Sequence, residues 1–524
     1  MATEKPNAVN LYDTQEKQLV SDCLSQNETD ATDHSTDDTT FSDAPWKFKV
    51  VALFTTLFFT SGAHFSTSAL SAMKSQIKSH LHIDNTQYGV ISSSVSIVNT
   101  LFPIFGGIFI DVFGSVWGIL TVNSIIVLGC LLTALAAKLQ SFGLMVAGRV
   151  LFGIGSGLIV TMQEAILYKW FRTHHLAIAI GLQVSITRLS NFVGTLAANP
   201  IAARTGDWVW SFWLSLILCS FSILVSLLYT LVVRHLQRGS RQRLLTSQEI
   251  QKLKRRHSFD WRGVLRFPLI YWHLLLIEFI YSAVWASFQT ISTDFVERHF
   301  GSTAVLAGYK ASTSQVVPIV AAPLLGVLID LYGCRVSVLL ISSLFLILST
   351  VLLGWTYVNA VIGMILYSIS LAFGLVSIIS SIGMVLPPEY LGTGSGIYKS
   401  TINIGTTILD IVVGVVQDHT QHQAYTGVMI LFLVLACVGF VLICTLWVSQ
   451  YVVLDNLLET GRKRRLKWMK ERDRQQMEDK KQGLDSQNTK IRFIHWICLM
   501  LFIAAMIVAW VLFFIYSASG SISA

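Results

Sequence analysis

The sequence predicts an all-α polytopic membrane protein, with six plus six transmembrane helices and one additional C-terminal transmembrane helix. Of the 524 residues, 53% are hydrophobic and 13% are charged, whereas an ordinary globular domain has roughly 25% charged residues. Apolar runs of about 20 residues recur along the chain, and each can cross a hydrocarbon core of roughly 30 Å as a helix. Two copies of one short motif, in matching places, divide the first twelve runs into halves.

Thirteen apolar runs predict thirteen membrane crossings. The first six lie at 48–73, 88–110, 117–137, 142–167, 176–201 and 208–233. The next six lie at 268–293, 306–329, 336–355, 358–386, 393–416 and 425–451, and the thirteenth lies at 493–516. Duplicated halves with the substrate site at their interface are a common architecture of transporters.

The chain outside these runs is polar. Residues 1–42 are rich in Asp, Thr and Ser, a composition typical of disorder. We therefore expect six parts: a disordered cytoplasmic tail (1–45), an N-terminal six-helix bundle (46–233), a basic cytoplasmic loop (234–267), a C-terminal six-helix bundle (268–453), a charged cytoplasmic segment (454–490), and the extra transmembrane helix with its short tail (491–524).

The net charge of +8 comes from particular loops. The loop between the sixth and seventh runs carries ten Lys or Arg residues and two acidic residues. The positive-inside rule places that loop, and with it the N-terminus, in the cytoplasm. The charge therefore describes membrane topology, and we expect the lipid bilayer as a partner and no nucleic acid.

Motifs for enzymatic chemistry are missing from the sequence. It contains no Gly-x4-Gly-Lys-Ser/Thr phosphate loop, no metal-ligand spacing among His and Cys, and nothing like a nucleophile elbow or catalytic triad. We therefore expect no enzymatic activity, no cofactor, no metal and no transport driven by ATP.

A Gly-x3-Asp-x2-Gly motif follows both the second and the eighth run. Glycines let two helices approach closely, and the Asp can face the N-terminus of a helix. We expect each copy to form a turn that gates the cytoplasmic end of its half. The two copies are Gly107, Asp111 and Gly114, and then Gly326, Asp330 and Gly333.

The fourth run combines small residues with a cation. The stretch 148–157 has glycines at close helical spacing, which allows neighbouring backbones to approach within a membrane. Arg149 lies in this stretch. It is either a gating residue or a packing residue whose guanidinium reaches toward the membrane surface.

Arg188 is the strongest candidate for a substrate-binding residue. It lies roughly 20 Å along the fifth helix from its cytoplasmic end, at about 1.5 Å per residue. Ionisable groups at that depth usually face a cavity or a partner, and a guanidinium can bind a carboxylate with two hydrogen bonds. The alternative is an internal ion pair that joins two helices. Gly181 precedes Arg188 by seven residues, as Gly396 precedes Asn403 in the second half, so Asn403 is a second candidate.

Other polar residues inside the runs are weaker candidates. Glu278, with Tyr281 on an adjoining helical position, lies near mid-depth of the seventh run and could meet a substrate amine. His64 in the first run is a proton-sensitive or hydrogen-bonding candidate. For His64, Asp410 and Lys399, a role as an internal partner is the favoured interpretation.

Glu164 and Gln163 lie side by side near the cytoplasmic end of the fourth run. Either both contribute to a substrate site, or Glu164 forms a salt bridge with Lys169 or Arg172. The second interpretation is slightly favoured for Glu164.

Several of these stretches resemble major facilitator proteins of the lysosomal dipeptide transporter type. The resemblance covers about the first twelve helices and leaves both tails and the thirteenth run unexplained. The stretches are ALSAMKSQIK (69–78), GGIFID (106–111), GRVLFGIG (148–155), GLQVSITR (181–188) and PEYLGTGSG (388–396).

The resemblance implies a major facilitator fold and facilitated export of dipeptides from an acidic organelle. It also implies a glycosylated single-span accessory subunit. In that family an arginine in the fifth helix meets the peptide carboxylate, and Arg188 matches it. An acidic residue early in the fourth helix meets the amine, but Gly157 stands at that position. Either Glu278 or Glu164 substitutes for it, or the substrate is not a dipeptide.

Three functions remain open from the sequence. The first is an alternating-access exporter of dipeptides or amino acids in a lysosomal or vacuolar membrane, with the plasma membrane as a second location. The second is a proton-coupled permease for small carboxylates, in which Arg188 binds an anion without an amine partner. The third, of another class, is a membrane scaffold or receptor that does not transport.

Overall fold

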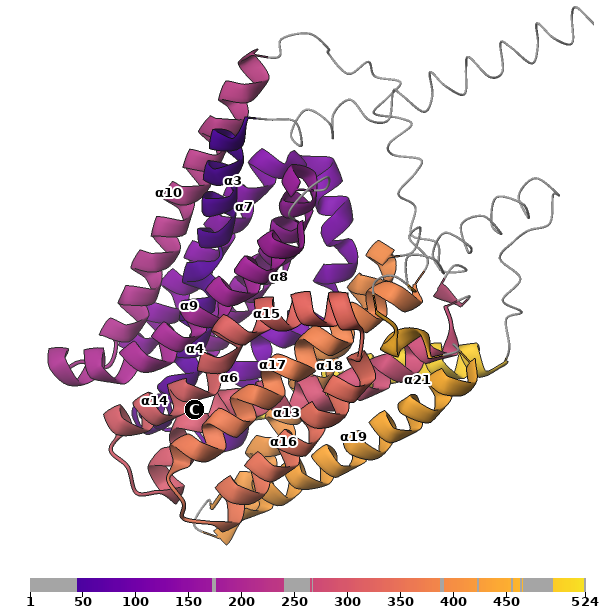
Figure 1. The fold of residues 1–524 in the computed structure, drawn as a ribbon. Coiled ribbons are helices and arrows are strands. Elements are labelled where there is room, and N and C mark those ends of the chain that lie inside the picture. Colours follow the sequence, from indigo (N-terminus) through magenta and orange to yellow (C-terminus); the bar gives the residue numbers. More distant parts are fainter. Residues whose placement is uncertain are drawn as a thin grey trace, which may run out of the picture.

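The computed structural model describes residues 45–171, 176–239, 264–265, 267–386, 391–421, 424–453, 456–461, 464 and 493–522. These residues form helices and connecting turns, and the described part of the chain contains no strand. Two groups of helices lie beside each other, one from indigo to magenta and one from pink to orange (Figure 1). The predicted all-α fold class is confirmed.

The N-terminal half contains eight helices among the described residues, because the first crossing is divided and a short helix follows it. A capping box at Asp84 and Gln87 begins α6. The helices are α3 (Trp46–Phe58), α4 (Ser61–Ala72), α5 (Lys74–Leu81), α6 (Asn85–Val98), α7 (Phe102–Leu139), α8 (Phe142–Phe171), α9 (Leu176–Thr205) and α10 (Trp210–Gly239).

The C-terminal half has the same general build, and one further long helix follows it. Its elements are α13 (Leu269–His299), α14 (Ala304–Ser312), η1 (Thr313–Gln315), α15 (Val316–Tyr332), α16 (Arg335–Trp355), α17 (Ala360–Val385), α18 (Leu391–His419), α19 (Thr426–Val453) and η4 (Leu457–Glu459). The further helix is α21 (Phe493–Ile522).

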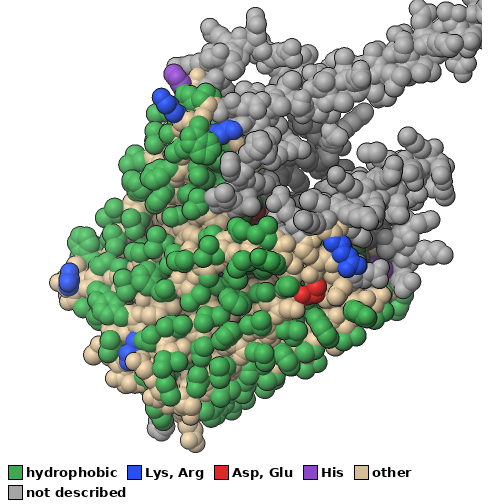
Figure 2. All heavy atoms as spheres, viewed as in Figure 1, with side chains coloured by type: hydrophobic (Ala, Val, Ile, Leu, Met, Phe, Trp, Pro, Cys, Tyr) green, Lys and Arg blue, Asp and Glu red, His purple; other side chains and the backbone are tan. Residues whose placement is uncertain are grey.

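Eleven helices in the described ranges are long and apolar enough to cross a membrane. Of the thirteen expected crossings, two are not among them. One corresponds to α6, which has only 14 residues. The other corresponds to α9, which is 30 residues long and from which Asn191 and Thr195 line a cavity. Hydrophobic side chains are spread over the described part of the face seen in Figure 2, with few charged ones among them, as expected for a surface in lipid.

The prediction of a turn at the first Gly-x3-Asp-x2-Gly copy is wrong. The backbone of α7 is helical from Phe102 to Leu139, so Gly107, Asp111 and Gly114 lie inside a helix. The side chains of 104–117 lie outside the described part. Glycine weakens a helix, but the backbone of α7 continues through both glycines of this copy.

The second copy does form a turn. Helix α15 ends at Tyr332, and Gly333 has φ +87. A Cβ at Gly333 would lie 2.5 Å from the carbonyl oxygen of Glu459, so only glycine fits there. Gly326 lies within α15, and the side chain of Asp330 is outside the described part.

The turn after α15 holds η4 in place. Ser337 donates to the Glu459 carboxylate through its backbone N–H (2.8 Å) and its hydroxyl (3.0 Å). Arg335 donates to the carbonyl of Leu458 at 3.3 Å. These contacts lie within the C-terminal half, so the gating role of the second copy stays a prediction.

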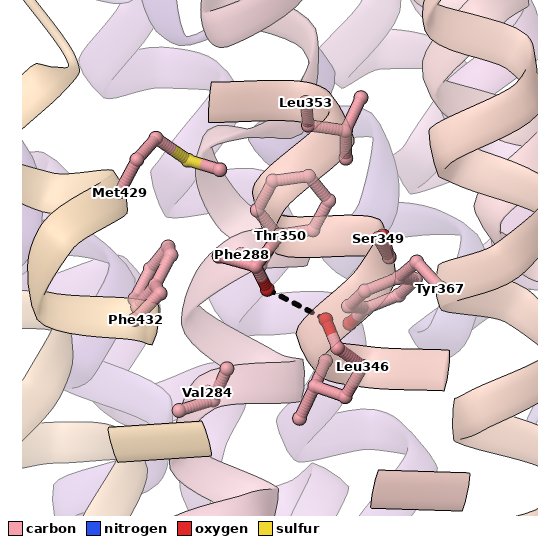
Figure 3. Close-up of a pocket in the computed structure, with 9 residues that line it drawn as sticks. All are labelled: Val284, Phe288, Leu346, Ser349, Thr350, Leu353, Tyr367, Met429 and Phe432. Carbon is pink, nitrogen blue, oxygen red and sulfur yellow. Dashed lines mark hydrogen bonds between the residues drawn. The ribbon is translucent and has the colours of Figure 1, made fainter. Parts of the chain in front are cut away.

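The interior of the C-terminal half is tightly packed around α13. Figure 3 shows the small gap that remains between α13, α16, α17 and α19, where Thr350 donates to the carbonyl of Leu346 at 2.8 Å. Its volume is about 10 Å³, roughly the space of one water molecule. A solute cannot bind there.

Helix α21 contacts both halves. It packs against α6 of the N-terminal half and α18 of the C-terminal half (Figure 1). Leu499 belongs to the hydrophobic core of the C-terminal half, whereas Ala509 and Phe513 belong to that of the N-terminal half. The indole N–H of Trp510 donates to the hydroxyl of Thr100 at 3.1 Å. The extra helix therefore covers the seam between α6 and α18.

A double-mutant cycle tests this attachment. Trp510→Phe and Thr100→Val each remove one partner of the hydrogen bond, and we expect a coupling free energy of about 0.6 kcal/mol, the average for interhelical hydrogen bonds in membranes. Thermal unfolding of the purified variants in detergent measures it. Additive effects of the two substitutions would show that the bond contributes nothing.

Candidate functional site

A cavity of about 190 Å³ lies between the two halves. Helices α4, α6, α8 and α9 line it from the N-terminal half, and α13, η1 and α18 line it from the C-terminal half. Only three of its lining residues, Leu70, Val95 and Ala286, lack a polar side chain. Polar groups inside a membrane are costly unless they face a cavity or a partner. This polar cavity is therefore the candidate site.

Arg188 points across the boundary between the halves. Its Nη1 donates to the side-chain oxygen of Gln315, a cavity residue of η1, at 3.3 Å. Its Nε has no hydrogen-bond partner. Within the described ranges, Arg188 forms no ion pair. No acidic residue of the described ranges therefore forms the internal ion pair that the alternative interpretation requires. The guanidinium keeps N–H donors for a bound anion.

His64 lies close to Arg188, which does not itself line the cavity but reaches it through its hydrogen bond to Gln315. The His64 ring lines the cavity from α4, with Nε2 3.5 Å from the hydroxyl of Thr187. The charge of Arg188 acts on this ring. These two residues, more than a hundred positions apart in the sequence, thus lie close together.

Arg149 is a second cation at the cavity. Its side chain is 2% exposed and lines the cavity from α8, with the guanidinium carbon 4.7 Å from the centre of the Phe152 ring. Its Nε has no hydrogen-bond partner, and no acidic residue of the described part pairs with it. The guanidinium therefore faces the cavity rather than the membrane surface.

Asp410 brings negative charge to the cavity from α18. Its carboxylate is buried and accepts hydrogen bonds from the hydroxyls of Ser287 (2.6 Å) and Ser92 (2.8 Å). In the described part of the chain no Lys or Arg forms an ion pair with it. The sequence analysis favoured an internal partner for Asp410. Its observed partners are two neutral hydroxyls, one from each half.

Glu278 and Tyr281 lie away from the cavity. Glu278 is 0% exposed, and its Oε1 accepts from the hydroxyl of Tyr398 at 3.0 Å. Tyr281 donates to the carbonyl of Ala436 at 3.3 Å within the core of the C-terminal half. Neither residue lines the cavity, so the structure does not bring them to the candidate site.

Glu164 also lies outside the cavity wall. Its carboxylate is 2.5 Å from Nζ of Lys399, so the pair joins α8 to α18 across the two halves. Lys169 and Arg172, the partners considered from the sequence, fall outside the described side chains. The observed partner comes from the other half instead.

Gln163 and Asn403 have structural partners close to this ion pair. Gln163 donates to the carbonyl of Thr56 at 2.8 Å and accepts from Gln183 at 3.0 Å. Asn403 donates to the backbone carbonyl of Lys399 at 2.7 Å. Neither lines the cavity.

The Glu164–Lys399 pair should contribute little to stability. Its side chains are 37% and 21% exposed, and ion pairs in contact with water contribute about 0 to 1 kcal/mol. We expect Glu164→Gln to change the free energy of unfolding by less than about 1 kcal/mol and to leave substrate choice unchanged. Chemical or thermal unfolding and transport assays check both statements; a change of substrate choice would return Glu164 to the site.

Gly157 faces the side-chain amide of Asn99 at the end of α6. A Cβ there would lie 1.8 Å from Oδ1 of Asn99. Any side chain at 157 would have to displace Asn99, whose Oδ1 has no hydrogen-bond partner. The space near the fourth helix is thus filled by an amide from the end of α6.

A buried cluster of charged and polar side chains joins the two halves at one end of the cavity, the end where α5 lies. Nζ of Lys74 is 3.4 Å from Asp294, and both side chains are at most 1% exposed. Lys74 also donates to Gln417 at 2.8 Å and to the hydroxyl of Tyr425 at 3.0 Å. Lys74 belongs to the N-terminal half and the other three residues to the C-terminal half. We call these four residues the clamp.

Asp418 supports the clamp from the end of α18. Its carboxylate accepts from the backbone N–H groups of Asn85 (3.1 Å) and Thr86 (2.8 Å) at the start of α6. Lys78 lies in the same region, and burial lowers its pKa to about 8, so its ammonium group keeps its proton at pH 7 and below. No sequence pattern singled out Lys74, Asp294 or Asp418 as candidate site residues.

Among the described residues, no group of three His, Cys, Asp or Glu side chains could hold a metal ion.

Comparisons with known proteins agree with this architecture. The family model described as Major Facilitator Superfamily matches residues 55–309 and 274–522. The Lysosomal dipeptide transporter MFSD1 of Bos taurus is 24% identical over 426 residues, covering 79% of this chain and 89% of that protein. The human protein of the same name matches over the same shares of both chains at 24% identity.

Solved structures share the fold. A bacterial homolog of the human lysosomal transporter Spinster, in an inward-facing and unoccupied conformation, has a TM-score of 0.60 at 14% identity, covering 78% of this chain and 99% of that one. The xylose transporter XylE from E. coli has a TM-score of 0.58 at 14% identity, covering 79% of this chain and 98% of that one. At such identities the likeness concerns the fold alone.

Proposed function

Because this chain belongs to the Major Facilitator Superfamily and is therefore a membrane transporter and not an enzyme, we propose that it exports dipeptides or related small zwitterions from a lysosome-like organelle by facilitated transport. Its relatives in cow and human are named lysosomal dipeptide transporters. The observation that carries the proposal is the environment of the Arg188 side chain. This side chain has a guanidinium beside a polar cavity, with a neutral amide as its partner and a free Nε.

A carboxylate is the natural ligand of such a guanidinium. Arg presents planar donors that match the two oxygens of a carboxylate, and the paired bonds are stronger than those to neutral acceptors. A charge within the membrane is costly without an anion, so substrate binding would offset part of that cost. Arg149, on the same half of the cavity, adds positive charge nearby. Arg188 is thus assigned the α-carboxylate, with His64 and Gln315 beside it.

Alternating access follows from the unequal ends of the cavity. The clamp closes the α5 end with a fully buried ion pair. The opposite end has the partly exposed Glu164–Lys399 pair. With the N-terminus in the cytoplasm, the clamp lies on the luminal side, and the weaker pair faces the cytoplasm. Release to the cytoplasm would then require only small energies, whereas uptake from the lumen requires opening of the clamp.

The parts of the chain outside the bundles keep the roles expected from composition. The tail 1–45, the loop 234–267 and the segment 454–490 are assigned to the cytoplasm, and 491–524 to the extra helix and its tail. The family resemblance further suggests a glycosylated single-span accessory subunit. Affinity purification of the tagged protein from its native organelle would recover such a subunit in a fixed ratio.

Uptake into liposomes tests the proposal. Purified protein is reconstituted, and uptake of a labelled dipeptide is compared with that of the same peptide carrying a C-terminal amide, with and without a pH gradient. We expect uptake of the free peptide, little uptake of the amide, and no need for the gradient. Gradient dependence would replace facilitated transport with proton coupling, and equal uptake of the amide would remove the carboxylate from the site.

A small-carboxylate permease is the second candidate function. The observation that favours it is the charge of the cavity wall, where Arg149 and the adjacent Arg188 outnumber the single carboxylate of Asp410. This candidate predicts uptake of a simple monocarboxylate by the same liposomes. Uptake of a monocarboxylate without uptake of any dipeptide would establish it.

A further inference from the structure

We propose that Asp410 binds the ammonium group of the substrate, the role for which the sequence offered Glu278 or Glu164. This inference rests on the proposed function, and it makes the substrate class specific: a solute with a free amine and a free carboxylate, held between the two halves.

Asp410 lies in the wall of the cavity. Of the residues that line the cavity, Asp410 is the one with an acidic side chain. It is 5% exposed. Each of its oxygens accepts one hydroxyl hydrogen bond, from Ser287 and from Ser92. A carboxylate has about four acceptor positions, so both oxygens keep capacity for a further donor.

The other candidate carboxylates do not line the cavity. Glu164 is paired with Lys399, and Glu278 is enclosed in the C-terminal half with Tyr398 as its donor. The clamp residue Asp294 is held by Lys74, Arg298 and Tyr425. An ammonium group that enters the cavity therefore meets Asp410 without displacing an existing cation.

Positive and negative side chains at the cavity come from different halves of the protein. Arg149 and Arg188 belong to the N-terminal half, whereas Asp410 belongs to the C-terminal half. A zwitterion can satisfy both sides at once, and a monovalent anion or amine can satisfy only one. Such a substrate would join the halves while bound, and its differential affinity for the joined state would drive the change of conformation.

Asp410 also has a structural contact that the test must separate from binding. The hydroxyl of Ser92 reaches it from the other half, so Asp410 helps to hold the halves together. Asp410→Asn keeps the size of the side chain and an acceptor for a serine hydroxyl, but it removes the charge. A matched control is Glu278→Gln, which replaces a buried carboxyl group outside the cavity.

The experiment compares a labelled dipeptide having free termini with its N-acetyl derivative, in liposomes that contain the wild-type protein or a variant. We expect the wild-type protein to prefer the free peptide by roughly 30-fold or more, because leaving one member of a buried charged pair unmatched is costly. Asp410→Asn should lose most of that preference, and Glu278→Gln should keep it. Asp410→Glu, which retains the charge, should also keep a preference.

The possible results either support or overturn the assignment of Asp410. Unchanged preference in a folded Asp410→Asn variant, or loss of preference in Glu278→Gln alone, would overturn the assignment of Asp410. Should Asp410→Asn not fold, loss of preference in Asp410→Glu would also overturn it, and retained preference would support it. Uptake of neither peptide by the wild-type protein would refute the proposed function itself.

Discussion

Arg188→Gln is expected to weaken the binding of a dipeptide by roughly 30-fold or more. Truncating one partner of a buried hydrogen-bonded charge pair costs about 2 to 5 kcal/mol, and each 1.4 kcal/mol is about tenfold in affinity. The glutamine can still meet Gln315, the one hydrogen-bond partner that the structure gives Arg188. The apparent affinity is measured from the concentration dependence of uptake into liposomes.

Arg188→Lys is the matched control for this prediction. Lysine keeps the positive charge but not the planar pair of donors, so its effect should be smaller than that of glutamine. A loss of uptake with unchanged apparent affinity in Arg188→Gln would contradict a direct role in binding. It would instead indicate that Arg188 acts only on the movement of the two halves.

Asp294→Asn is expected to open the clamp. Removing one partner of a buried ion pair costs about 3 to 5 kcal/mol, whereas conformations of a protein often differ by only a few kcal/mol. Lys74 would remain buried without its counter-charge, and burial already lowers the pKa of Lys74. The protein should therefore shift toward a state that is open at the α5 end. Labelling of a cysteine at Ser71, a cavity residue of α4, measures that opening.

A double variant separates the ion pair from general damage. Lys74→Gln with Asp294→Asn leaves no fully buried lysine without its counter-charge, and Arg298, the other cation that pairs with Asp294, is 38% exposed, so labelling should return toward the wild-type rate. Glu164→Gln, at the opposite and more exposed pair, should leave the labelling rate unchanged. Equal labelling of the wild-type protein and Asp294→Asn would show that the clamp does not hold this end closed.

The sequence was most informative where the physical cost is highest. A charge at mid-membrane depth marked Arg188, and the structure places it next to the cavity with His64. The fold class followed from apolar runs of membrane length and from the division into halves. These conclusions depend on local composition and helix length, which a sequence contains directly.

Depth alone could not separate Glu278 from Asp410. Both are carboxylates inside helices, and only the packing of the halves turns Asp410 toward the cavity and encloses Glu278 against Tyr398. The partner of Glu164 is likewise 235 residues away along the chain. Such long-range pairings depend on how the bundles meet, and one sequence does not encode them in any local pattern.

The two copies of the glycine motif show that the position of a turn also depends on contacts far along the chain. Their spacing is identical, but the backbone turns only at Gly333, whereas α7 continues through the first copy. The contact of Gly333 with Glu459 comes from a segment far along the chain. The position of α21 across the α6–α18 seam is similarly a property of assembled helices.

Direct binding to the purified protein tests the central claim, that the cavity recognises a carboxylate through Arg188. Isothermal titration calorimetry would compare a dipeptide having free termini with the same peptide as a C-terminal amide, in wild-type protein and in Arg188→Gln. We expect the wild-type protein to bind the free peptide at least roughly 30-fold more tightly than the amide, and Arg188→Gln to bind both weakly. Equal affinity of the wild-type protein for the two peptides would contradict it.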